Sequence, residues 1–196
     1  MAALRYYVAA TVDGFIARED GAFDVFAAEG GHVADYVAFM RAQRVVLMGR
    51  RTYEVGLALG VTNPYPWLRQ VVFSRTLPAS PDANVELVAG DPAEFVRRLK
   101  AEQPDADLWL CGGGALAAAL LGAGLVDEVI VKVSPVLLGS GVPLVARLGR
   151  AVPLDLVAST THAGGVVVLR YGVRPDADVP NASPDGSPDA AAGGGR

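Results

Sequence analysis

Short apolar runs, rich in β-branched and aromatic residues, recur along the chain and alternate with segments of helical periodicity. A continuous apolar run of this kind is typical of a strand that is covered on both faces of a sheet. Six runs predict such strands, at Leu4–Ala10, Val45–Met48, Gln70–Phe73, Asn84–Val88, Leu108–Leu110 and Asp127–Val133. Strands that alternate with helices predict an α/β fold with a mainly parallel sheet.

The segments between these strands place apolar residues at helical spacing. Asp91 and Pro92 suit a helix start, because Asp can cap the free N–H groups and Pro is favoured at the first position. Helices are therefore predicted at His32–Gln43 and Thr52–Leu59, from Pro92 onward, and at Ala115–Leu121.

The last part of the pattern is antiparallel. Leu154–Thr161 and Val166–Val173 predict a hairpin that turns at Ala163-Gly164-Gly165. Thr11–Gly31 has little periodicity and predicts a long loop. Beyond Arg174 the composition shifts to Pro, Asp, Ser, Ala and Gly, so we predict one domain over residues 1–174 and a disordered tail over residues 175–196.

Three glycines follow the strand predicted at Leu108–Leu110. Gly112, Gly113 and Gly114 lead directly into a helix, and a glycine turn before a helix start suits an anion, since the backbone N–H groups are free and no Cβ blocks them. Taken alone, the triplet is equally well explained as a tight turn without a ligand or as a phosphate site.

Two other strand ends carry the same kind of residue. Gly49-Arg50-Arg51-Thr52 follows Val45–Met48, and Ser74-Arg75 follows Gln70–Phe73. Ligands of open parallel sheets bind at the carboxyl ends of the strands. The glycine turns could each hold one phosphate of a dinucleotide, and the arginines could bind the ribose 2′-phosphate that distinguishes NADP from NAD.

A Rossmann fingerprint is the competing interpretation of the triplet, because Gly112-x-Gly114-x-x-Ala117 satisfies its loose form. That fingerprint belongs in the first strand–helix–strand unit, with an acidic residue about twenty positions later. Here several strands precede the glycines, and Asp127 and Glu128 come too early. The Rossmann interpretation therefore has low weight.

Composition narrows the classes of partner. The net charge of -4 and the pI near 5.1 argue against nucleic acid as a partner. A single cysteine, Cys111, and only two histidines, His32 and His162, leave no residues for a zinc site, so no metal is predicted. Without a leader pattern or a long apolar run, we expect a cytoplasmic protein that does not enter a membrane. Both histidines are expected at the surface or in turns.

Five motifs together carry a family resemblance. They resemble the dihydrofolate reductase-like superfamily, and more closely the C-terminal reductase domain of the riboflavin-biosynthesis deaminase-reductase. The motifs are Ala9-x-x-x-Asp13-Gly14-x-Ile16-Ala17, Met48-Gly49-Arg50-Arg51-Thr52-Tyr53-Glu54, Phe73-Ser74-Arg75, Gly112-Gly113-Gly114, and Asp127-Glu128 followed by Pro135-Val136-Leu137-Leu138-Gly139.

This resemblance implies a three-layer α/β/α fold with an antiparallel C-terminal hairpin, NADPH as cofactor, and a homodimer. The backbone of Ala9 would meet the nicotinamide carboxamide, and Ser74 and Arg75 would lie beside the adenosine phosphate. Gly49, Arg50, Arg51 and Thr52 would hold the pyrophosphate and 2′-phosphate, and the residues that would cover the pyrophosphate are Gly112, Gly113, Gly114 and Leu116.

The implied reaction is hydride transfer to a small molecule, as in 5-amino-6-(5-phosphoribosylamino)uracil reductase. Asp13 and Asp35 are the candidate proton donors, although Asp13 also suits a turn before Gly14 and Asp35 also suits the first turn of a helix. Two alternatives stay open: a reductase acting on another pterin or carbonyl, and a nucleotide-binding module without catalysis. The tyrosine that dihydrofolate reductases carry after the glycines is replaced by Ala117, which counts against folate.

Overall fold

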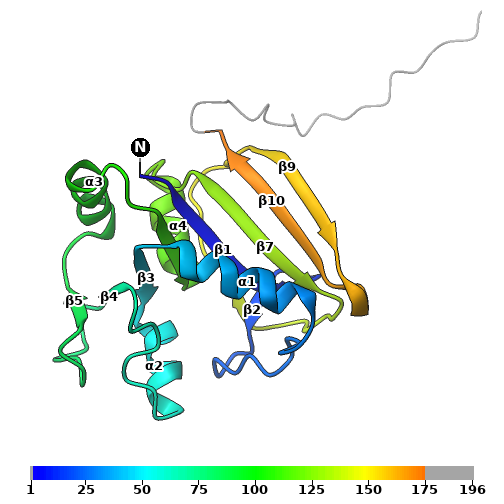
Figure 1. Cartoon of the computed structure of the whole chain (residues 1–196), viewed down its shortest axis with the longest axis horizontal. Coiled ribbons are helices and arrows are strands. Elements are labelled where there is room, and N and C mark those ends of the chain that lie inside the picture. Colours follow the sequence, from blue (N-terminus) through cyan, green and yellow to red (C-terminus); the bar gives the residue numbers. More distant parts are fainter. Residues whose placement is uncertain (1, 175–196) are drawn as a thin grey trace, which may run out of the picture.

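An eight-stranded sheet organises residues 2–174, the part of the chain that this computed structural model describes (Figure 1). The strand order is β5-β4-β3-β6-β1-β7-β10-β9. All pairs from β5 to β7 are parallel, whereas β10 is antiparallel to both β7 and β9. The bounds are β1 Leu4–Thr11, β3 Val45–Gly49, β4 Arg69–Phe73, β5 Val85–Val88, β6 Leu108–Gly112, β7 Glu128–Ser134, β9 Leu154–Thr161 and β10 Val167–Val173. The predicted fold class and hairpin are confirmed; the predicted tail lies outside the described residues.

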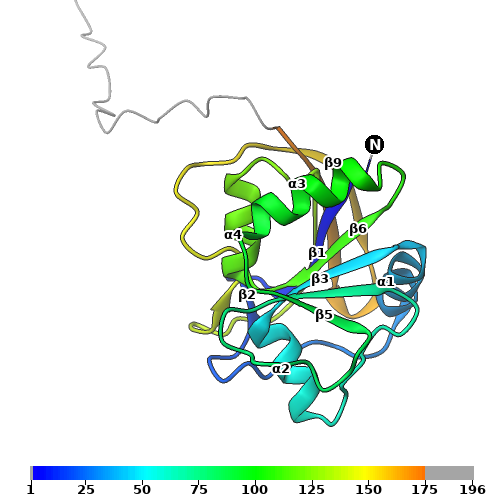
Figure 2. The same cartoon turned by 90° about the vertical axis from the view of Figure 1, so that its left-hand side faces the viewer.

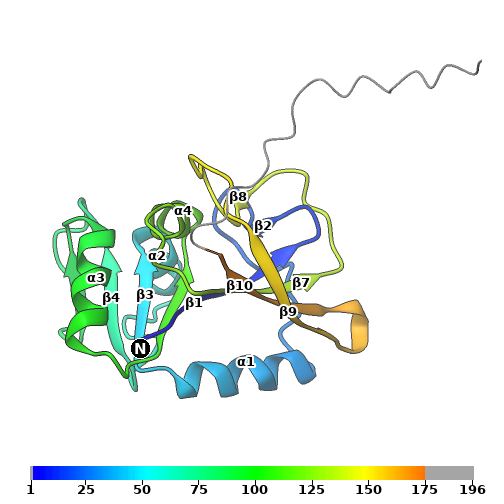
Figure 3. The same cartoon turned by 90° about the horizontal axis from the view of Figure 1, so that it is seen from above.

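Helices cover both faces of this sheet. They are α1 Gly31–Ala42, α2 Arg50–Ala58, α3 Pro92–Glu102 and α4 Gly114–Gly122. Side chains of α3 and α4 pack with Val45 and Leu47 of β3, whereas side chains of α1 and α2 pack with Val46 and Met48 of the same strand. Successive residues of a strand point to opposite faces, so this division gives three layers. Figures 2 and 3 show α1 and α4 on opposite sides of the sheet.

Aromatic rings fill the space between α1 and the sheet. Tyr36 and Phe39 of α1 stand edge-on to Tyr7 of β1, with ring centroids 4.9 and 4.8 Å away. Trp109 of β6 is fully buried, and its indole N–H donates to the Tyr7 carbonyl oxygen at 3.1 Å. The paired indole N–H lets a tryptophan sit in an apolar layer without leaving a donor unsatisfied. None of the helices within residues 2–174 is long and apolar enough to cross a bilayer.

The long loop predicted at Thr11–Gly31 contains a strand, so that prediction is wrong in part. β2 Phe15–Ala17 pairs antiparallel with β8 Val142–Pro143. The Leu144 N–H also donates to the Gly14 carbonyl oxygen at 2.8 Å. Each partner is too short to show a strand pattern in the sequence, because their pairing joins segments far apart in the chain.

Two helices begin earlier than predicted. α2 begins at Arg50 rather than Thr52, directly after an extended Gly49, so both arginines lie in its first turn. α1 begins at Gly31, and its first turn holds no acidic residue, because Asp35 is the fifth residue of the helix and lies just beyond the dipole-stabilising positions. The predicted start of α3 is confirmed, since the Asp91 carboxylate accepts from the Ala93 N–H at 2.7 Å.

The start of α4 packs tightly against the segment after β8. The Ala146 N–H donates to the Gly114 carbonyl oxygen at 3.0 Å. A Cβ on Gly114 would overlap the Pro143 carbonyl oxygen and lie 3.3 Å from the Leu144 carbonyl oxygen. The third glycine of the triplet is therefore needed for packing between α4 and this segment.

We expect Gly114→Ala to lower the free energy of unfolding by about 1–3 kcal/mol, the usual cost of overpacking. Urea unfolding followed by circular dichroism measures it. Gly122→Ala at the other end of α4 is the matched control, because a Cβ there has nothing within 4 Å. Equal stability of the Gly114→Ala protein and the original would contradict this packing.

Candidate functional site

Two glycine turns meet at the carboxyl ends of the neighbouring strands β3 and β6. A Cβ placed on Gly49 would lie 3.6 Å from the Gly112 carbonyl oxygen, and one on Gly113 would lie 3.6 Å from the Gly49 Cα. Gly113 also has a φ of 104°, which side chains other than glycine rarely tolerate. The sheet therefore brings together the two glycine segments that the sequence separates by more than sixty positions.

The helices that follow these turns begin side by side without caps. Gly49 is the N-cap of α2 and Gly113 is the N-cap of α4, and at neither helix start does an N–H group donate to a capping side chain. The first N–H groups of an α-helix have no partner within the helix, and they carry a partial positive charge. Two adjacent uncapped starts can bind an anion larger than a single phosphate.

Three arginines follow the ends of β3 and β4: Arg50 and Arg51 lie in the first turn of α2, and Arg75 comes two residues after Phe73, which pairs with Gly49. Arg51 and Arg75 are exposed, and within residues 2–174 neither forms an ion pair. Arg50 differs, because its Nη1 lies 2.7 Å from the Glu54 carboxylate one turn along α2. Arg51 and Arg75 are thus the guanidinium groups that can turn to a ligand without breaking a contact inside the protein.

The remaining residues predicted for the cofactor lie along the same edge. Thr52 faces the second turn, since a Cβ on Gly112 would lie 3.4 Å from its Oγ1. Leu116 is buried beside Gly113, within α4. Ser74 is buried at the end of β4, where its Oγ accepts from the Leu77 N–H at 2.8 Å.

Asp13, one of the two candidate proton donors, lies in a hydrogen-bonded turn after β1. Its carboxylate accepts from the Thr11 hydroxyl and from the N–H groups of Leu138 and Gly139, at 3.0 and 2.7 Å. These bonds hold the pKa of the Asp13 carboxyl below its ordinary value, and the bond from Thr11 has the largest effect. An ionised carboxylate that holds a loop in this way is suited to positioning.

Asp35, the other candidate, stands on α1 away from the glycine turns. Its side chain is 66% exposed, and its Oδ2 lies 3.7 Å from Nε2 of His162. Asp35 and Asp13 occupy different elements, and no hydrogen bond joins them in the described part of the chain.

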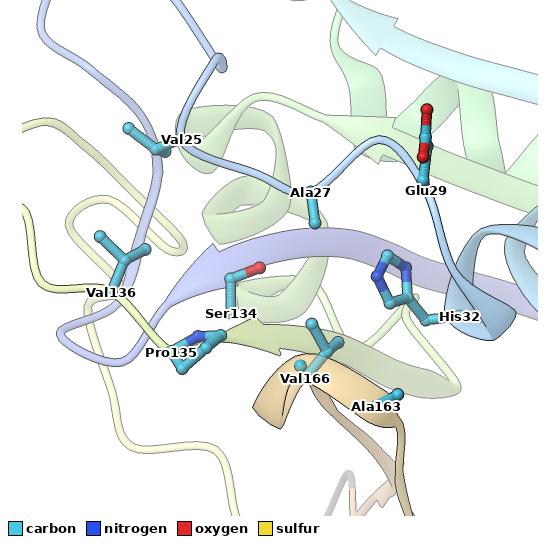
Figure 4. A pocket seen from close by; sticks show the side chains of 10 residues that line it. Val25, Ala27, Glu29, His32, Ser134, Pro135, Val136, Ala163 and Val166 are labelled. Carbon is cyan, nitrogen blue, oxygen red and sulfur yellow. The ribbon is translucent and has the colours of Figure 1, made fainter.

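A cavity of about 270 Å³ opens at the carboxyl end of β7, on the other side of β1 from the glycine turns (Figure 4). Ser134 ends β7 and His32 is the second residue of α1, and both side chains line the cavity. His32 was expected at the surface, but only 1% of it is exposed, so that expectation is wrong. The β9–β10 hairpin closes over this part of α1 and buries it, which local sequence could not indicate.

Lys132 stands two residues before Ser134, on the same face of β7. It is 8% exposed, and its Nζ lies 5.8 Å from the centre of the Tyr36 ring. Burial lowers the pKa of Lys132. Lys132 is not among the site residues predicted from the sequence, although it is the single charge inside the apolar run from Val129 to Val133.

Two known proteins are similar to this chain over most of its length. The chain is 34% identical to YwjB of Bacillus subtilis over 168 residues. The aligned region covers 84% of this chain and 94% of YwjB. A crystal structure from Shewanella sp. PV-4, named for riboflavin biosynthesis, matches with a TM-score of 0.76 and 26% identity over 88% of this chain and 99% of that one.

A longer protein shares the fold over part of its length. It is the Thermotoga maritima diaminohydroxyphosphoribosylaminopyrimidine deaminase/5-amino-6-(5-phosphoribosylamino)uracil reductase, with a TM-score of 0.65 and 17% identity over 88% of this chain and 57% of that one. The family described as the RibD C-terminal domain matches residues 2–168. Since that match spans nearly all described residues, the chain belongs to the RibD C-terminal domain family, whose members are reductase-type domains.

Proposed function

We propose that this protein is an NADPH-dependent reductase that transfers hydride to a phosphorylated ribosylaminopyrimidine or a similar small molecule. The observation that carries the proposal is the close approach of the two glycine turns, which sets two uncapped helix starts side by side, with Arg51 in the first turn of α2 and Arg75 just after the neighbouring strand β4. Membership of the RibD C-terminal domain family supports the same function.

The cofactor would lie along the carboxyl ends of the central strands. Its pyrophosphate would take the free N–H groups at Gly49 and Gly113, and its 2′-phosphate would take Arg51 and Arg75, with Arg50 free to join once Glu54 releases it. The nicotinamide would then reach the backbone of Ala9 near the end of β1. NADPH supplies the hydride, and the protein supplies orientation and exclusion of water.

The Thermotoga maritima relative names the substrate class that we carry to this chain, 5-amino-6-(5-phosphoribosylamino)uracil. A reductase acting on a pterin or another carbonyl would use the same cofactor groove. Turnover of dihydrofolate in place of the pyrimidine would support that alternative, and cofactor binding without turnover of either compound would support a module without catalysis.

Replacing both Arg51 and Arg75 by Ala should raise the Kd for NADPH at least about tenfold, because charge-assisted bonds to a phosphate are lost. The Kd for NADH should change little, since NADH has no 2′-phosphate. Titration followed by nicotinamide fluorescence measures both values.

The control is Arg97→Ala, which removes the same charge from an exposed position on α3. An unchanged preference for NADPH over NADH in the double variant would refute the role of the arginines. Failure of the original protein to bind either cofactor would refute the cofactor assignment.

We propose that Asp13 positions the loop after β7 beside the nicotinamide, with its carboxylate ionised. The backbone N–H groups of Leu138 and Gly139 lie on that loop, and the short bond from Gly139 is 2.7 Å. A role for Asp13 or Asp35 as proton donor stays a prediction. Substitution of Asp13 distinguishes a positioning role from a role as proton donor.

Asp13→Ala should lower the melting temperature and speed amide hydrogen exchange at Leu138 and Gly139, because both N–H groups lose their acceptor. Asp13→Asn keeps one carbonyl acceptor, so it should fall between Ala and the original and should keep measurable turnover. Loss of turnover in Asp13→Asn, with the melting temperature and NADPH affinity unchanged, would instead identify Asp13 as the proton donor.

We also propose that two copies pair through β9. This strand ends the sheet and is exposed along all eight of its residues, including Leu154, Leu156 and Val157. Its one charged residue, Asp155, already contacts Arg174 at 3.2 Å. Edge strands of monomers usually carry charges or Pro that prevent pairing, and β9 lacks them from Leu156 onward. A two-fold axis would pair β9 antiparallel with itself.

Leu156→Lys should convert a dimer to a monomer, because it places a charge within the paired edge. Light scattering coupled to size-exclusion chromatography measures the mass. The control Leu59→Lys changes an equally exposed leucine at the end of α2. A monomeric original protein, or a Leu156→Lys variant that stays dimeric, would contradict pairing through β9.

A further inference from the structure

The cavity at the end of β7 is lined by three segments that are far apart in the sequence. Val25, Ala27 and Glu29 come from the connection before α1, Ser134 from β7, and Ala163 from the β9–β10 turn. Figure 4 shows the Ser134 hydroxyl on the side of the cavity where His32 stands, whereas the carboxylate of Glu29 points away from Ser134. Glu29 is exposed, so its charge is solvated at the rim.

Polar atoms that face this region have no partner within the described protein. Nδ1 of His32 and Oγ of Ser134 are buried, and neither forms a hydrogen bond. His32 is 1% exposed and Ser134 is 3% exposed. Buried polar groups in native proteins are nearly always paired, so these two atoms are free to pair with a water molecule or a ligand that enters the cavity.

A buried positive charge lies on the same strand as Ser134. Lys132 stands two residues before Ser134 on the same face of β7, and its Nζ lies 5.8 Å from the centre of the Tyr36 ring of α1. After burial, the charge of Lys132 is the second cause of the lowered pKa of His32. Within residues 2–174, no carboxylate forms an ion pair with Lys132. Asp35, the acid nearest to His162, is 66% exposed to solvent.

The start of α1 adds further donors. Gly30 is the N-cap, and no side chain accepts a hydrogen bond at this helix start. The N-terminus of a twelve-residue helix favours negative charge. Together with Lys132, Ser134 and His32, this arrangement offers donors from several directions, which suits a tetrahedral oxyanion better than a planar one.

We propose that this cavity is the subsite for the phosphate monoester of the substrate, with Lys132 as its charge partner and Ser134 and His32 as its hydrogen-bonding partners. This proposal rests on the proposed reductase function. It names the residues that would make the enzyme select a substrate with a phosphorylated sugar. Register supports the placement: Ala9, the residue proposed to meet the nicotinamide, pairs with Lys132, and Thr11 pairs with Ser134. The phosphate would thus lie one strand away from the hydride donor.

The experiment measures binding of D-ribose 5-phosphate to the full chain by isothermal titration calorimetry, with NADPH affinity measured separately by fluorescence. Lys132→Met should weaken ribose 5-phosphate at least tenfold, and Ser134→Ala should weaken it about three- to tenfold. Both variants should keep the original NADPH affinity. Both should also match or exceed the original melting temperature, because each removes a buried polar group that lacks a protein partner.

Arg41→Met is the matched control. It removes one exposed charge from the last turn of α1, at the opposite end of that helix from the cavity. It should leave ribose 5-phosphate binding unchanged. D-ribose and D-gluconate should bind far more weakly than ribose 5-phosphate, because one lacks the oxyanion and the other carries a planar carboxylate.

Unchanged ribose 5-phosphate affinity in Lys132→Met would overturn the proposal. If that variant is poorly folded, Ser134→Ala decides, and its unchanged affinity would overturn the proposal equally. Equal binding of ribose or gluconate to the original protein would refute phosphate as the ligand. Loss of NADPH binding would refute the proposed reductase function alone, since the ribose 5-phosphate measurements use no cofactor.

Discussion

The close approach of Gly49 and Gly113 is the constraint on which the proposed cofactor site depends. Parallel pairing of β3 with β6 brings the strand ends together, so that a Cβ on either glycine would be in van der Waals contact with the other turn. Gly113 is favoured for a further reason, because its φ of 104° is a conformation that other residues rarely adopt. Gly114, the third glycine, is required by packing, because the Pro143 carbonyl oxygen occupies the place that a Cβ would take.

β1 separates this site from the cavity that holds His32 and Ser134. On one side it pairs with β6 and its glycine turn, and on the other it pairs with β7, whose Lys132 and Ser134 lie level with Ala9 and Thr11. A ligand bound to each side would meet the other at the end of β1. This geometry is what a hydride-transfer enzyme needs, since the two reacting atoms must be held in contact with water excluded.

The sequence predicted the parts of the fold that depend on local pattern. Apolar runs such as Val45–Met48 and the cap at Asp91 each carry their own signal, so the strands and the start of α3 were confirmed. The pairing of β2 with β8 and the burial of His32 arise from contacts between distant segments, which no window of sequence contains. The cofactor residues remain predictions from motif and resemblance, now with Gly49 and Gly113 in contact. Lys132 could have been selected, because a charge inside an apolar strand requires an explanation.

Both sides of β1 leave polar groups unsatisfied at one edge of the sheet. The helix starts at Gly49 and Gly113 lack caps, and Ser134 and His32 lack partners, although the same chain caps α3 with Asp91 and pairs the indole of Trp109. A sequence that satisfies such groups elsewhere can satisfy them here, for instance with Ser as an N-cap or Ala in place of Ser134. Stability alone would favour those changes. These are therefore the groups with which the two proposed ligands would pair, and ligands bound there would raise the stability of the folded protein.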